Sequence, residues 1–129
     1  MCQISTSKKF RKTDKDIVVY KTLRAYDDGR HRSSVMNFSY AINHLYVNEM
    51  DEIMHGIHRL SRLKYETNEG FHSYQSYRSA KKRICFDFER VAKCIIPAGS
   101  MILKGRHSSE NLFNPRTIVS NQIIIKEIM

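Results

Sequence analysis

The chain has 129 residues, of which 22 are basic and 13 acidic, so its formal charge is +9. This length fits one domain that buries a core without disulfides or metals, and 41% hydrophobic residues without a low-complexity tract exclude a disordered chain. The basic excess favours anionic partners without selecting one. The longest apolar runs, Ile17–Tyr20 and Ile123–Ile125, are too short to span a membrane.

The three cysteines and the first residues indicate a compartment. Cys2, Cys85 and Cys94 are odd in number and form no CxxC pair. The N-terminal residues lack the apolar stretch of a secretory signal. We therefore expect free thiols in a reducing, cytoplasmic environment.

The chain begins with a basic segment over residues 1–15, which we expect to be loosely ordered. A single domain is expected over residues 16–129. Asp16–Leu23 is rich in β-branched residues and predicts a strand that ends before a turn. Asn37–Val47 alternates less regularly and predicts a weaker strand.

Two helices are predicted in the middle of the chain. Over Asn48–Tyr65, apolar residues recur at helical spacing, acidic residues lie near the start and basic residues near the end. Gly56 weakens this helix by about 1 kcal/mol relative to Ala. After a turn, Ser76–Phe88 shows a second apolar face opposite a basic one.

Three further strands are predicted towards the C-terminus. Val91–Ile96 is strongly apolar, Met101–Lys104 follows the turn at Pro97, and Thr117–Ile128 contains three consecutive isoleucines. His107–Arg116 between them is polar and predicts a loop. Strands and helices without regular βαβ alternation favour a single compact α+β domain, mainly antiparallel sheet with two helices.

The chain shows no recognisable catalytic apparatus, so we expect it not to be an enzyme and to need no cofactor. No phosphate-binding glycine loop, nucleophile elbow or zinc-protease motif is present. His55 and His58 lie three residues apart, but no third metal ligand has suitable spacing. Cys94 lies in an apolar run, where a buried thiol is unreactive.

Binding chemistry is better represented. Arginine forks suit phosphates, aromatic rings stack on bases, and asparagine reads base edges, so a nucleotide uses all three. Each cluster alone also fits an ordinary solvated surface. We expect a small anionic ligand to be held by Arg32, Phe71, His72, Arg106, Asn111, Asn114, Arg116 and Ser120.

The order of four segments resembles a family of small proteins encoded by phages and prophages. The segments are DIVVYK from Asp16, EGFHSY from Glu69, VAKCIIPAGSMILKG from Val91 and SNQIIIKEI from Ser120. The resemblance covers most of the chain from Asp16 onward but not Asn48–Tyr65. It is similar in character to the viral sponge proteins that counter Thoeris, CBASS and related defence signalling.

This resemblance implies a non-catalytic protein that sequesters a cyclic nucleotide messenger, such as a cyclic ADP-ribose isomer or a cyclic oligonucleotide. It further implies a homo-oligomer in the cytoplasm of an infected bacterial host, with ligand held near subunit boundaries. A basic nucleic-acid-binding accessory protein remains an alternative, because the N-terminal run and the Arg78–Arg83 face are basic.

A second resemblance is to ADP-ribosyltransferase-like folds. A tyrosine followed by a basic residue on an early strand, a Gly-Phe-His segment and a late strand carry it. Those enzymes need a glutamate near the end, often as ExE, whereas this chain has only Lys126-Glu127 there. The likeness therefore implies a degenerate, non-catalytic relative, with Glu127 as the one candidate acid if the protein is an enzyme.

Overall fold

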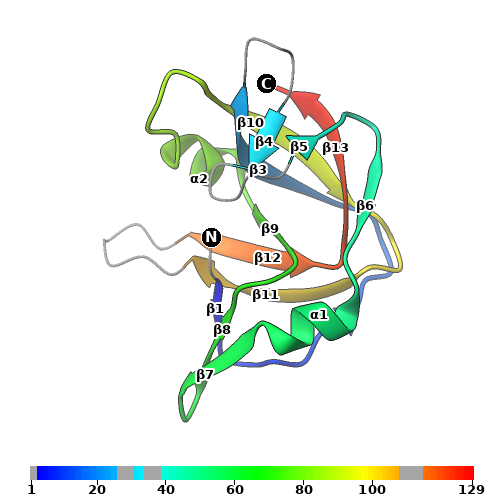
Figure 1. Ribbon diagram of the computed structural model, residues 1–129, viewed down its shortest axis with the longest axis vertical. Coiled ribbons are helices and arrows are strands. Elements are labelled where there is room, and N and C mark those ends of the chain that lie inside the picture. Colours follow the sequence, from blue (N-terminus) through cyan, green and yellow to red (C-terminus); the bar gives the residue numbers. More distant parts are fainter. Residues whose placement is uncertain (1–2, 26–30, 34–38, 108–114) are drawn as a thin grey trace.

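The computed structural model describes residues 3–25, 31–33, 39–107 and 115–129 (Figure 1). In this part of the chain, thirteen strands form one sheet and two six-residue helices lie against it. Every ladder between the strands is antiparallel, which confirms the predicted antiparallel sheet with two helices. Strands make up 55% of the structure, so the fold is mainly β and not a balanced α+β arrangement.

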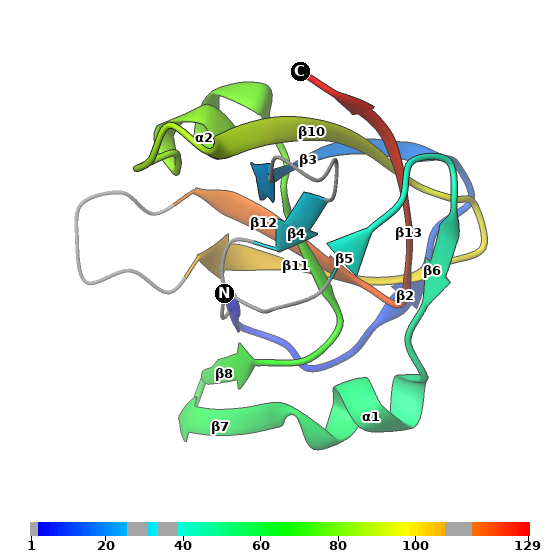
Figure 2. The ribbon, with the colours of Figure 1, turned by 45° about the horizontal axis from the view of Figure 1, so that its top comes forward.

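The sheet consists of two halves that face each other across the core (Figure 2). The first half runs in the order β6 (Leu45–Val47), β13 (Gln122–Ile128), β10 (Glu89–Ile96) and β3 (Ile17–Ala25). The second half runs in the order β9 (Phe71–Tyr74), β12 (Arg116–Ser120), β11 (Met101–His107), β1 (Gln3–Ser5), β8 (Lys64–Thr67) and β7 (Ile57–Ser61). Between β3 and β9 a single register pair, Tyr20 with Tyr74, joins the halves.

Three short strands complete the sheet. They are β4 (His31–Ser33), which pairs with β3, β5 (Ser39–Tyr40), which pairs with β4, and β2 (Arg11–Lys12), which pairs with β11. The main core lies between the two halves and includes Val19, Cys94, Ile118 and Ile125, each at most 2% exposed. We call the side of the sheet that carries this cluster the inner face, and the opposite side the outer face.

The first helix is much shorter than predicted. α1 spans Met50–His55, and the chain continues as β7, which pairs with β8, so the prediction of a helix over Asn48–Tyr65 is wrong in its second part. The helix ends at Gly56, where a Cβ atom would lie 2.4 Å from Cγ of Glu69. Leu60 and Leu63, assigned to the apolar stripe, are 53% and 69% exposed.

The second helix also ends early. α2 spans Tyr77–Lys82, and its cap is Ser76, whose Oγ accepts a hydrogen bond from the Ser79 amide at 3.2 Å. Beyond the helix, the buried Glu89 carboxylate accepts from the Cys85 and Phe86 amides at 2.9 and 3.2 Å. Glu89 is the first residue of β10, so these bonds fix a turn between the helix and that strand. The sequence predicted helix up to Phe88 instead.

Gln3–Ser5 and Arg11–Lys12 pair with strands of the sheet, whereas a loosely ordered segment was expected over residues 1–15. β1 pairs with both β8 and β11. The buried Gln3 amide donates to the Leu103 carbonyl at 3.0 Å and accepts from the Thr117 hydroxyl at 2.7 Å. Gly105 permits this contact, because a Cβ atom there would lie 2.4 Å from the Ile4 carbonyl oxygen.

The predicted final strand, Thr117–Ile128, is two strands that belong to different halves of the sheet. β12 and β13 meet at a bend at Asn121, whose side-chain oxygen accepts from the Met101 amide at 2.8 Å. Across the described residues, no helix is long and apolar enough to cross a bilayer.

Candidate functional site

The inner face of three neighbouring strands changes from apolar to basic along the strands. Residues that pair across β9, β12 and β11 form rows on this face, because alternate side chains of a strand point to the same side. The most buried row belongs to the core and the last row is polar. From the core outward, the rows are Phe71, Ser120 and Ile102; then Ser73, Ile118 and Lys104; then Gln75, Arg116 and Arg106.

The exposed end of this face brings three cations together. Arg106 and Arg116 are register partners on adjacent antiparallel strands, so their Cβ atoms lie about 5 Å apart. Lys104 pairs with Ile118 and is therefore the diagonal neighbour of Arg116, at about 7–8 Å. All three side chains are exposed. We call Lys104, Arg106 and Arg116 the basic patch.

Three of the predicted ligand residues are instead buried. Phe71 is 7% exposed and packs in the main core, so its ring offers no open face for a base. Ser120 is fully buried, and its hydroxyl donates to the Gln122 carbonyl at 2.9 Å. His72, 7% exposed, lies on the opposite side of β9 from Phe71.

The side chains of the other three predicted residues lie outside the described structure. Arg32 is paired through its backbone with Arg24 on β3 and Ser39 on β5, and its side chain lies outside the described structure. Asn111 and Asn114 fall in the segment 108–114, also outside it. Of the eight predicted residues, the structure thus brings Arg106 and Arg116 directly together at the surface.

Lys21 is a buried cation that sequence reasoning missed. Its side chain is 7% exposed, its ammonium donates a hydrogen bond to the His72 carbonyl, and it lies 5.6 Å from the centroid of the Tyr40 ring. Burial lowers the pKa of Lys21 to about 8, an effect that Cys94 partly opposes. The available signal was its position between Val19 and Leu23, which puts a lysine on the core-facing side of a strand.

We expect Lys21 to make the protein more stable as the pH rises from 8 to 10.5. In this interval the native lysine loses its proton while the unfolded lysine, with the ordinary pKa of 10.5, keeps it. The unfolded state then binds more protons, so the free energy of unfolding gains about 3 kcal/mol. The raised pKa of Cys94 acts on stability in the opposite direction at high pH. The contribution of Lys21 is therefore measured by urea unfolding as the difference between wild type and Lys21→Met over this range.

The exposed lysine Lys82 on α2 supplies a matched control for this measurement. Lys82→Met should keep the wild-type profile, because its ammonium is hydrated in both states. Identical profiles for wild type and Lys21→Met would contradict a buried, desolvated ammonium.

The His72 side chain, on the outer face of β9, is also buried away from water. Its Nε2 lies 3.2 Å from the Glu69 carbonyl oxygen, and within the described residues its buried Nδ1 has no hydrogen-bond partner. Burial, and next the charge of Lys21, lower the pKa of His72 to about 3. This imidazole is therefore neutral at physiological pH.

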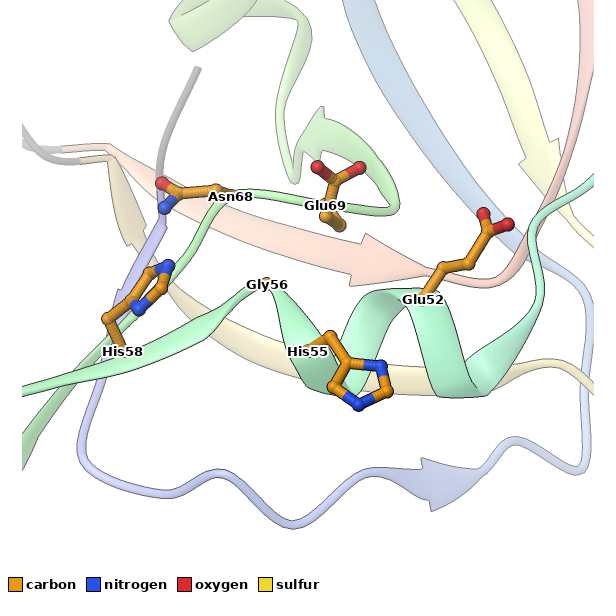
Figure 3. Close-up of a pocket in the computed structure, with 6 residues that line it drawn as sticks. All are labelled: Glu52, His55, Gly56, His58, Asn68 and Glu69. Atoms are coloured by element: carbon orange, nitrogen blue, oxygen red, sulfur yellow. The ribbon is translucent and has the colours of Figure 1, made fainter.

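A second, acidic site lies beside the start of β9, whereas the basic patch lies near the end of that strand. A pocket of about 440 Å³ opens between the end of α1 and the start of β9 (Figure 3). It is lined by Glu52, His55, Gly56, His58, Asn68 and Glu69. Figure 3 shows the ring of His58 directed towards Asn68, apart from the ring of His55. No group of three or more potential ligands could hold a metal ion in the part of the chain that the structure describes.

The two groups considered for covalent or acid–base chemistry are poorly placed for it. Cys94 is fully buried, and burial raises the pKa of its thiol to about 12, which disfavours the nucleophilic thiolate. Glu127 is exposed on β13 opposite Lys93. Three strands, β10, β3 and β9, separate β13 from β12 in the sheet order, so Glu127 does not belong to the basic patch.

Comparison of the chain with protein-family models, with curated proteins and with solved structures finds no match. The functional argument therefore rests on the basic patch and on the chemistry of its residues.

Proposed function

We propose that this protein is a non-catalytic binding protein whose basic patch holds a phosphate-bearing nucleotide. The observation that carries the proposal is the register of β11 and β12, which sets Arg106 directly opposite Arg116. Guanidinium forks match phosphate oxygens in bidentate geometry, so two arginines side by side suit one phosphate group.

Neighbouring groups add to the same chemistry. Lys104 places a third charge beside the two arginines. Gln75, half-buried and one residue beyond β9, donates its backbone amide to the Arg116 carbonyl at 3.2 Å and its side-chain amide to the Thr117 carbonyl at 3.4 Å. Its position beside Arg116 puts a neutral hydrogen-bonding side chain next to the charges, as recognition of a ribose or a base requires.

The narrower form of the proposal is a sponge for a cyclic nucleotide messenger of anti-phage signalling. It is supported by the resemblance of the segments from Asp16, Glu69, Val91 and Ser120 to small phage proteins, and by the formal charge of +9. In this form the protein acts as a homo-oligomer in the cytoplasm of an infected bacterium and releases its ligand unchanged.

We expect Arg106→Ala and Arg116→Ala each to weaken nucleotide binding by about ten- to a hundredfold, which corresponds to 1.5–3 kcal/mol for a charge-assisted hydrogen bond. Isothermal titration should use a panel of cyclic dinucleotides, cyclic trinucleotides and cyclic ADP-ribose isomers. Arg62→Ala, at an exposed position in the turn between β7 and β8, is the matched control and should bind as wild type does.

Each alternative has a distinct outcome in the same experiment. Ligand recovered intact after denaturation supports sequestration, whereas a converted ligand would mean that the protein is an enzyme. If no nucleotide of the panel binds, and if long DNA or RNA binds with an affinity that falls steeply with salt, the nucleic-acid alternative would replace the proposal. Wild-type affinity in the double variant of Arg106 and Arg116 would remove the basic patch from the site.

A further inference from the structure

The two ends of the sheet differ in how they are protected against pairing with another chain. In the order of the described strands, β6 forms one end and β7 the other. Natural edge strands carry charges that oppose further pairing. β7 follows this rule with the exposed Arg59, whereas β6 consists of Leu45, Tyr46 and Val47 and carries no charge.

The outer face next to β6 carries a continuous apolar row. Val18 pairs with Ile95, Ile95 with Ile124, and Ile124 with Leu45, so four side chains lie side by side across four strands. Val18 and Leu45 are 43% and 45% exposed, and Val47 on the same face of β6 is 58% exposed. The row thus reaches β6, the uncharged strand, which Figure 2 shows at the edge of the sheet.

We propose that β6 and this apolar row form the interface with a second copy of the chain. A two-fold axis beside β6 would pair the two β6 strands antiparallel, which extends the sheet and joins the two apolar rows end to end. A second copy fits better than a different partner because the surface is its own complement: an edge of alternating donors and acceptors, and a row of aliphatic side chains. Two chains of charge +9 repel each other least where neither carries a charge.

The backbone register identifies the amides that would pair. The backbone amide of Asn48, just after β6, points to the side of β13 and donates to the Asn121 carbonyl at 2.8 Å. Because antiparallel strands alternate the direction of their amides, the amides of Leu45 and Val47 point away from β13. These two amides would become hydrogen-bonded in the dimer.

Sedimentation equilibrium from about 1 µM to about 1 mM protein covers the affinities of weak and moderate dimers. Wild type should dimerise, and Leu45→Lys and Val47→Lys should each raise the dissociation constant at least about a hundredfold, because each substitution brings two lysines, one from each copy, among apolar side chains beside the axis. Leu63→Lys introduces the same change at a more exposed leucine, 69% exposed between β7 and β8, and should dimerise as wild type does.

Hydrogen exchange on the wild-type protein tests the same interface without a substitution. Protection of the Leu45 and Val47 amides should increase with protein concentration. A wild type that stays monomeric, a dimer unaffected by Val47→Lys, or amides whose protection is independent of concentration would overturn the proposal. Added salt should strengthen this dimer by screening the net charge, whereas it weakens nucleotide binding at the basic patch, so either proposal can fail while the other holds.

Discussion

Replacing His72 with Gln should remove a large part of the loss of stability that the protein suffers in acid. Above pH 6.5 the imidazole is neutral in both states and contributes no pH dependence. Between pH 6.5 and 3 the unfolded histidine gains a proton that the native one, with its pKa of about 3, does not bind. The unfolded state then binds more protons, so the free energy of unfolding decreases as the pH is lowered, by a total of about 4–5 kcal/mol.

Urea unfolding at several pH values between 7 and 4 measures this effect directly. Glutamine keeps an N–H donor for the Glu69 carbonyl but has no proton to gain, so the fall in the free energy of unfolding should be smaller by about 3 kcal/mol over that interval. His58→Gln, at an exposed histidine on β7, should follow the wild-type curve. Parallel curves for wild type and His72→Gln would show that His72 takes up a proton as readily in the native state as in the unfolded state.

Ile53→Ala should lower the free energy of unfolding by about 2–5 kcal/mol, the usual range for truncating a fully buried aliphatic side chain. Ile53 is 0% exposed on α1 and packs against Phe10, Leu103 and Val119. Alanine would leave a cavity between the helix and the second half of the sheet. Urea titration measures the change, provided that the slope of the unfolding free energy with denaturant stays constant.

Leu60→Ala is the matched comparison, because periodicity puts both residues on one apolar helical face. In the structure Leu60 lies on β7 and is 53% exposed, so its truncation should cost less than about 0.5 kcal/mol. Equal losses for the two variants would contradict the end of the helix at Gly56 and restore the longer predicted helix.

The strands that the sequence predicted correctly have strong local signals. β3 and β10 consist of β-branched and apolar runs that end at turns, and both are found within two residues of their predicted limits. The helical signal over Asn48–Tyr65 was also local, but two contacts override it. Gly56 packs against Glu69, and β7 forms a ladder with β8. Hydrogen bonds between strands outweigh a helical preference of a few tenths of a kcal/mol per residue.

The candidate site shows the same division. Residue chemistry was enough to select Arg106 and Arg116 as candidate phosphate ligands, but not to show that the two side chains are neighbours. Their proximity depends on the register of β11 and β12, and a shift of one residue would move either side chain to the other face. The burial of Phe71 and Ser120 follows from the same register, which puts them in the core row.

Length, charge and local residue patterns were enough to predict a basic chain with an antiparallel sheet and two helices, although both helices end earlier than predicted. These properties depend on total composition and on residues that are close together in the chain, and both can be read directly from the sequence. The bent sheet, the place of β1 within it, the buried Lys21 and His72, and the basic patch depend on contacts between residues far apart in the chain. Gln3, for example, bonds to Leu103 and Thr117, which are 100 and 114 positions away. Such contacts arise from burial and strand pairing in three dimensions, and no local pattern of residues encodes them.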